Sequence, residues 1–160
     1  MKAFSDVFTE IDQTTSTNEK ISALVGYFKT AEPRDAIWCV ALLTGRRPKR
    51  TVKSGELREW CIALSGIPAW LVEESYHIVG DLAETITLLL PENNDVQEYK
   101  LHEIVHALIA LKDKSDDERK EYIITMWQSL TKEQLFRIQQ THHRELPGGR
   151  VGEDRDKGTG

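Results

Sequence analysis

Apolar residues recur every three or four positions along most of the chain, which is the spacing of an amphipathic helix. The first stripe consists of Phe4, Val7, Phe8 and Ile11. A second stripe follows a cap at Thr17 or Asn18 and consists of Ile21, Leu24, Val25 and Phe28. No segment alternates apolar and polar residues for long enough to predict a strand. The pattern therefore predicts an all-α fold, a bundle of about eight helices in two packed subdomains.

Residues that start or stop helices predict where the later elements lie. Pro33 suits the first turn of a helix that runs to about Leu43, and Gly45 lies beyond its end. Further helices are predicted from Ser54 to near Gly66, from Pro68 to Val79, from Asp81 to before Pro91, from Glu98 to Lys112, and from the capping-box residues Ser115 and Thr131. The polar stretch 92–97 is predicted to join two helical halves.

Size and composition are those of a folded protein. The chain has 160 residues, 39% of them apolar, which suits one domain or two small packed subdomains. No apolar run approaches the roughly 20 residues that span a bilayer, and the first residues lack the apolar segment of a secretory signal. Cys39 and Cys61 lie on apolar helix faces, so we expect reduced core thiols in a cytoplasmic protein.

Basic residues cluster at one place although the chain is acidic overall. It has 21 Lys and Arg against 26 Asp and Glu, a net charge of -5, whereas general attraction to a polyanion needs the opposite balance. Gly45 and Pro48 predict an exposed loop at the cluster. Five cations fall within this loop with no acid among them: Arg46, Arg47, Lys49, Arg50 and Lys53. The cluster predicts one face for a polyanion, and the alternative is an ordinary solvated loop.

A zinc-peptidase motif is present in form. His102, Glu103 and His106 make an HExxH sequence on a predicted helix. On a helical wheel the apolar residues cover one side, both histidines fall at its margin and Glu103 points away. Ile109 and Lys112 stand where the extended motif needs a Gly and a third His. We therefore expect histidines at the solvated edge of a helix and no metal site, and we treat the later pair His142 and His143 as tail.

Several stretches resemble the N-terminal DNA-binding domain of bacterial ATP-dependent DNA ligases, in the group whose domain order is similar to that of replicative ligases. These are LTGRRPKR at 43–50 and WLVEESYHIVGDLAETI at 70–86, supported by the opening residues, by Tyr27 and Phe28, and by Trp127, Leu135 and Phe136. The most specific piece is VGDLAE at 79–84, where we interpret Gly80 as a helix end and Asp81 as a cap. The resemblance covers about residues 1–140.

The resemblance implies a helical clamp that grips the DNA minor groove on both sides of a nick. The chain would bind nicked double-stranded DNA without sequence preference, and the full-length enzyme would join nicks in DNA repair, replication and recombination. Its partners would be DNA and the adenylation and OB-fold domains. The full-length enzyme uses ATP and Mg, but we expect no cofactor in this chain. The candidate DNA-binding residues are Thr44, Gly45, Arg46, Arg47, Lys49, Arg50 and Lys53.

Catalysis is not expected of the chain alone, because it lacks the Lys-x-Asp-Gly motif whose lysine takes AMP from ATP in that family. The resemblance stops after Gln139, and residues 141–160 are too polar to extend a core, so we expect a disordered tail. A one-base shift of the reading frame can restore the family's next motif from residue 140 onward. We therefore hypothesise a frameshift that truncated a ligase near residue 139. The coding DNA tests this hypothesis, because it shows whether a one-base shift restores the motif.

Two readings from other classes stay open. The chain could be a helical protein–protein adaptor whose basic loop binds an acidic partner. A zinc peptidase is the third reading, and it would require stoichiometric zinc at the HExxH helix.

Overall fold

The computed structural model describes residues 1–143, with side chains through Gln140, and within this range it holds helices and connecting loops without any strand. The α-helices in this range are α1 (Lys2–Asp12), α2 (Thr17–Thr30), α3 (Pro33–Leu43), α4 (Ser54–Ser65), α5 (Ala69–Val79), α6 (Leu82–Leu89), α7 (Leu101–Ala110), α8 (Asp116–Trp127) and α9 (Lys132–His143). A short 3-10 helix, Leu111–Asp113, extends α7. The all-α prediction is confirmed. None of these helices is both long and apolar enough to cross a membrane.

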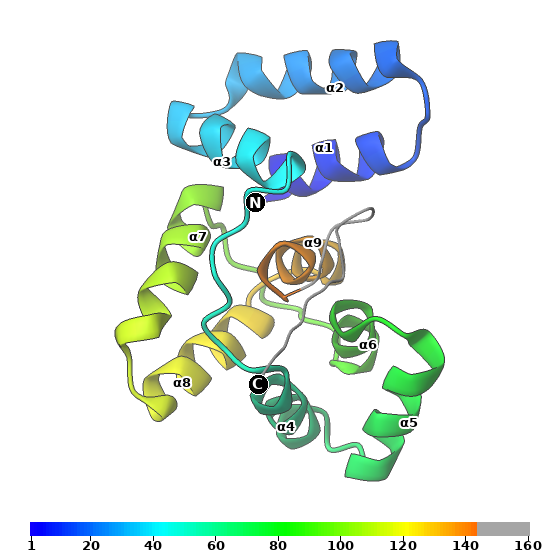
Figure 1. The fold of residues 1–160 in the computed structure, drawn as a ribbon, viewed down its shortest axis with the longest axis vertical. Coiled ribbons are helices and arrows are strands. Elements are labelled where there is room, and N and C mark those ends of the chain that lie inside the picture. Colours follow the sequence, from blue (N-terminus) through cyan, green and yellow to red (C-terminus); the bar gives the residue numbers. More distant parts are fainter. Residues whose placement is uncertain (144–160) are drawn as a thin grey trace, which may run out of the picture.

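Helix α9 lies in the middle of the molecule, and the other helices surround it in three groups (Figure 1). Helices α1–α3 form one end, α4–α6 form the other end, and α7 and α8 lie along one side. Helix α9 packs against both α1 and α6, and α3 packs against α7. Residues 92–97 lie within the segment 90–100 that connects α6 to α7. The halves on either side of this connection share one continuous apolar core.

Helix α9 contributes both apolar and polar groups to the core. Leu135 and Ile138 are almost completely buried. Arg137 is also buried, and its guanidinium donates from Nη2 to Thr9 Oγ1 at 3.2 Å and from Nη1 to Asp12 Oδ2 at 3.3 Å. The same guanidinium lies 4.8 Å from the centre of the Phe8 ring. Apolar packing and a paired cation therefore fasten α9 to α1 together.

Capping residues set the helix ends, and two of the predicted starts are wrong. Ser16 caps α2, because its hydroxyl accepts from the Glu19 amide at 3.3 Å, so the cap is neither Thr17 nor Asn18. Helix α7 begins three residues after Glu98, where the Glu103 carboxylate accepts from the Lys100 amide at 2.9 Å. The predicted capping boxes at Ser115 and Thr131 are confirmed.

The junction between α5 and α6 has the structural role that the sequence predicts. Gly80 ends α5 with a φ of 80°, a conformation that glycine adopts without the strain of a side chain. Asp81 caps α6 through its carboxylate, which accepts from the Glu84 amide at 3.1 Å. This most specific piece of the sequence resemblance therefore shapes a helix turn.

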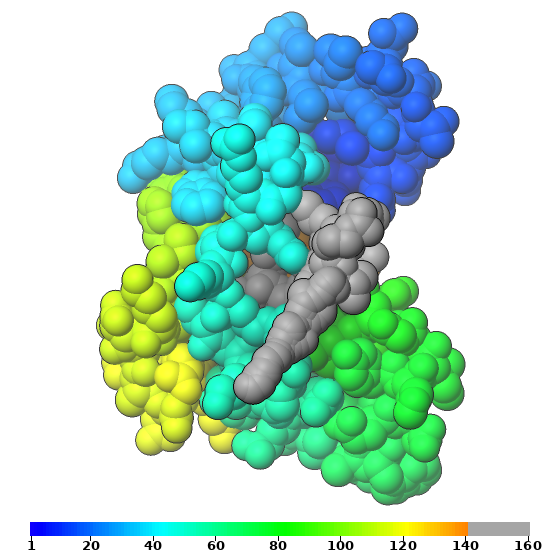
Figure 2. Space-filling view, viewed as in Figure 1, coloured from blue at the N-terminus to red at the C-terminus, as the bar shows by residue number. Residues whose placement is uncertain are grey.

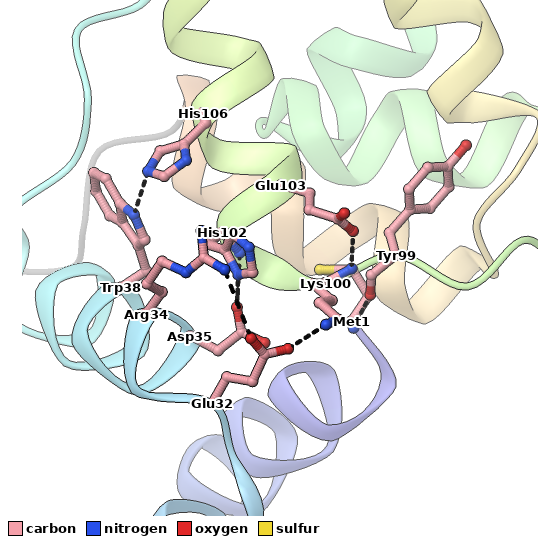
Figure 3. A network of polar contacts seen from close by, with 10 residues as sticks. All are labelled: Met1, Glu32, Arg34, Asp35, Trp38, Tyr99, Lys100, His102, Glu103 and His106. Atoms are coloured by element: carbon pink, nitrogen blue, oxygen red, sulfur yellow. Dashed lines mark hydrogen bonds and ion pairs between the residues drawn. The ribbon is translucent and has the colours of Figure 1, made fainter.

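A buried polar network joins α3 to α7 (Figure 3). Asp35 Oδ1 accepts from the His102 amide at 2.9 Å and lies 2.6 Å from His102 Nδ1. The His102 side chain is only 7% exposed, so its predicted place at the solvated edge is wrong, because α3 covers that edge of α7. Burial opposes the charge of Asp35, but the hydrogen bonds from the His102 amide and ring outweigh it and lower the pKa of Asp35.

Helix α2 turns much of its apolar stripe outward. Ile21, Val25 and Phe28 are exposed, while Tyr27 is the buried side chain of this helix. The reason is that α1 packs against the opposite side of α2, which carries Ala23 and Tyr27. Most of the stripe that the sequence pattern assigns to a core is therefore exposed, while its residue Leu24 is partly buried against the core.

Both cysteines are core residues, as predicted. Cys39 on α3 and Cys61 on α4 are fully buried and form no disulfide. Burial raises the pKa of Cys39 to about 12 and that of Cys61 to about 11. Both groups therefore remain protonated thiols at neutral pH and act as small apolar side chains.

Substituting Asp35→Asn should lower the free energy of unfolding by about 1–2 kcal/mol at pH 7, because a charge-assisted hydrogen bond to His102 is lost. A carboxylate whose pKa is lowered by folding stabilises the protein above its ordinary pKa of 3.8, and this contribution is lost as the pH falls further. The difference in the free energy of unfolding between the wild type and the Asp35→Asn variant should therefore narrow below about pH 4. Urea unfolding at pH 7 and pH 3 measures it.

The matched control is Asp6→Asn, which breaks the exposed pair between Asp6 and Lys2 on α1. This variant should unfold like the wild type at both pH values, since exposed ion pairs contribute little. Equal stability of Asp35→Asn and wild type at pH 7 would contradict the role given to Asp35.

Truncating Leu135→Ala should lower the free energy of unfolding by about 2–5 kcal/mol, because it opens a cavity in the central helix. Leu88→Ala is the control, since Leu88 is exposed on α6 and should change stability by no more than about 0.5 kcal/mol. Denaturant titrations followed by circular dichroism compare the two variants. A small effect at Leu135 would show that α9 is not the centre of the core.

Candidate nucleic-acid interface

The basic loop, residues 44–53, begins at a left-handed glycine. Gly45 has a φ of 87° directly after α3. Its amide donates to the Leu42 carbonyl at 3.2 Å, and the Arg46 amide donates to the Ala41 carbonyl at 2.8 Å. These two bonds make a Schellman motif, which closes the end of α3 and turns the chain sharply away from the helix axis.

Three contacts hold the basic loop against the body of the domain. The Val52 side chain is buried in the core. Thr51 Oγ1 donates to the Leu108 carbonyl of α7 at 3.0 Å, and Arg47 Nη1 donates to the Gln140 carbonyl of α9 at 3.2 Å. The loop is therefore fixed on both sides by helices that belong to the core, and it crosses the face seen in Figure 2, in cyan, between α3 and α4.

The anchored loop presents its remaining cations to solvent. Arg46, Lys49, Arg50 and Lys53 are exposed, whereas Arg47 is half-buried. Arg46, Lys49 and Lys53 form no ion pair with any residue that the structure describes. The structure thus brings the five predicted cations together on one segment, and Arg47 also serves as an anchor.

The acid nearest to the loop in sequence is engaged at the start of α4 and by α8. Glu56, in the first turn of α4, accepts from the Lys53 amide at 3.1 Å and lies 3.4 Å from Arg119 Nη2 of α8. The Glu56 carboxylate therefore stabilises the first turn of α4 and pairs α4 with α8 through Arg119. The positive charge of the loop is not cancelled by this neighbour.

Thr44 and Gly45 are exposed, but their hydrogen-bond donors are used within the turn. The Thr44 hydroxyl donates to the Val40 carbonyl at 2.8 Å and lies 3.1 Å from the Ala41 carbonyl oxygen. The Gly45 amide is committed to Leu42. Contact between these two residues and a phosphate stays a prediction, and it would rest on close approach of the backbone rather than on a free amide.

Thr51 and Val52 position the loop, and the sequence interpretation did not include them. Val52 is a single apolar residue in a run of polar and basic residues, and that contrast is the signal that could have identified it as an anchor. Thr51 gave no comparable signal, because its partner on α7 lies 57 positions further along the chain.

The HExxH residues are engaged with other protein groups. His102 faces Asp35, His106 Nε2 accepts from Trp38 Nε1 at 3.3 Å, and the Glu103 carboxylate accepts from the Lys100 amide (Figure 3). Within the described part of the chain, no three His, Cys, Asp or Glu residues are placed to hold a metal ion. The geometry around α7 is thus that of a helix contact.

Helix α9 continues to His143, so the prediction that His142 and His143 belong to the tail is wrong, and the other predictions about the tail fall outside the described residues. These are the disorder expected for the tail through residue 160 and the reading-frame shift after Gln139. The candidate cations themselves lie between α3 and α4, within the described residues.

Comparison with known proteins agrees with this arrangement. A family model described as DNA ligase N terminus matches residues 1–146. The match begins with α1 and runs past the end of α9, so it includes the basic loop and all the helices that anchor it. No curated protein matches the chain significantly. Because the family model covers most of its length, the chain belongs to the DNA ligase N-terminus family.

Proposed function

We propose that the chain binds nicked duplex DNA through its backbone and minor groove, without sequence preference, as the N-terminal domain of a bacterial ATP-dependent DNA ligase. The observation that carries the proposal is the anchored basic loop on an otherwise acidic domain. Contacts from Arg47 to Gln140 and from Thr51 to Leu108 fix the loop, and its exposed cations project from there. Family membership supplies the independent support.

The form of the loop suits backbone binding. Phosphate contacts need cations at a fixed spacing and carry no sequence information, whereas base reading needs side chains that enter a groove in a set orientation. Because the loop is held by helices before DNA arrives, little conformational entropy is lost on binding. The acidic remainder of the domain repels DNA elsewhere, which restricts docking to this face.

Covalent chemistry belongs to other domains in this proposal. The sequence contains no Lys-x-Asp-Gly, so the adenylation domain of the enzyme would supply the lysine, with ATP and Mg, and the OB-fold domain would complete the grip on the duplex. The chain would position the nick for joining in DNA repair, replication and recombination in the cytoplasm. The buried protonated thiols of Cys39 and Cys61 are compatible with that compartment.

A second candidate is a protein–protein adaptor in which the loop binds an acidic segment. The observation that favours it is the exposed apolar surface of α2 and α3, which DNA phosphates would not require. Binding of a nicked duplex at two salt concentrations separates the candidates, because the adaptor has no salt-sensitive complex with DNA.

Affinity for a nicked duplex should fall steeply with salt. If all five cations bind phosphates, the plot of log K against log salt concentration should have a slope of about −4 to −5. Arg46→Ala should reduce the magnitude of the slope by about 1, since one counterion-releasing contact is removed. Fluorescence anisotropy with a labelled nicked duplex gives both slopes, and a slope near zero would rule out the proposed mode of binding.

Reversing two exposed charges, Arg46→Glu with Lys49→Glu, should weaken DNA binding by roughly tenfold or more at low salt. The control is Lys112→Glu with Lys120→Glu, which changes net charge equally at exposed positions after α7 and on α8. The control should bind within about threefold of wild type, because it retains the loop. Equal weakening by both pairs would show that net charge, and not the loop, attracts DNA.

A further inference from the structure

An apolar surface lies beside the basic loop at one end of the molecule. We call it the α2–α3 face, and its exposed large side chains are Ile21, Val25, Phe28, Ile37 and Val40. Ile37 is 68% exposed. A hollow of about 430 Å³ opens on this face, bordered by Phe28, Ile37 and Val40 and, at one end, by Arg46. An exposed apolar surface of this kind marks a docking site for another molecule.

The charges around the α2–α3 face are positive. The acids of α2 and of the start of α3 are turned elsewhere: Glu19 accepts from Thr14, Glu32 pairs with Lys100, and Asp35 faces His102. Lys29 and Arg46 are exposed and form no ion pair with any residue that the structure describes, whereas the exposed Arg34 lies 3.9 Å from a carboxylate oxygen of Glu32. The face therefore fits a partner that combines apolar side chains with carboxylates.

Helix α5 presents a surface of that chemistry. Trp70, Glu74 and Ile78 follow one another at four-residue spacing, which places them in a row along the helix. Trp70 is 67% exposed and Ile78 is 83% exposed. Glu73, beside this row, is exposed but pairs with Arg58 at 3.2 Å, so Glu74 is the carboxylate that the row itself presents. We call this row the α5 face.

The two faces cannot meet within one molecule. Helices α2 and α3 lie at one end of the long axis and α5 lies at the other end, as Figures 1 and 2 show. We propose that the α5 face of one copy of this chain docks into the hollow of the α2–α3 face of a second copy. Trp70 would enter the hollow, and Glu74 would approach Arg46 at its border.

Such a contact joins different surfaces of two identical molecules. Each pair leaves one α5 face and one α2–α3 face unused, so the association continues as an open chain instead of closing as a symmetric dimer. A single helix in a hollow buries little surface, and the association should be weak and sensitive to salt. Arg46 belongs to the basic loop and also borders the hollow, so bound DNA would compete with the second copy.

Sedimentation velocity on the purified chain without DNA tests the proposal. At low salt the weight-average mass of the wild type should rise with concentration over roughly 10 μM to 1 mM. Ile37→Asp removes the docking surface of one face and Trp70→Asp removes the anchor of the other. Each variant alone should remain monomeric, with at least tenfold weaker association than the wild type.

Mixing the two variants gives the decisive result. The Ile37→Asp protein keeps a complete α5 face and the Trp70→Asp protein keeps a complete α2–α3 face. An equimolar mixture should therefore form one-to-one pairs and nothing larger. Leu88→Asp is the control, because Leu88 is exposed on α6 outside both faces, and it should associate like the wild type. Thermal unfolding of all variants checks that each is folded.

A wild type that stays monomeric throughout the concentration range would overturn the proposal and leave the two faces to other proteins. So would association of either single variant at wild-type strength, or a mixture that fails to pair. Anisotropy of the Ile37→Asp variant with nicked DNA is measured separately. Since Ile37 lies outside the basic loop, loss of self-association with retained DNA binding distinguishes this proposal from the DNA-binding function.

Discussion

Burial of α9 between the other helices is the constraint on which the rest of the structure depends. Leu135 and Ile138 fill the centre of the core, and Arg137 ties the same helix to α1. The end of α9 also supplies the Gln140 carbonyl that receives Arg47. Helix α9, which lies late in the sequence, therefore fixes the arrangement of the bundle. It also fixes the position of the basic loop, which lies far earlier in the chain.

Two acids on the helices that flank the basic loop are engaged by other groups. Asp35 is paired with His102, and Glu56 is paired with the start of α4 and with Arg119. The cations of the basic loop face solvent on a domain whose net charge is -5. Because a charged ligand responds to the local potential, this positive surface can attract a polyanion although the domain is acidic overall, and the proposed contact with DNA depends on it.

The sequence by itself determined the helices and the cationic segment, because both follow from local spacing and composition. Apolar periodicity and helix-capping residues together predicted the helices, the Ser115 and Thr131 boxes predicted two helix starts, and Gly80 with Asp81 predicted a junction. Helix ends were less well determined where several caps compete. Ser16 caps α2 in place of its neighbours, and Glu103 starts α7 later than the apolar pattern indicates.

Only the tertiary structure decided which faces are covered and which residues position the loop. Periodicity gives the direction of an apolar stripe but not the identity of its neighbour, so it could not show that His102 lies under α3 or that Ile21, Val25 and Phe28 remain exposed. The anchors Arg47 and Thr51 depend on carbonyl groups 93 and 57 positions away. Contacts over such separations exist only once α7 and α9 have packed, because no local signal specifies them.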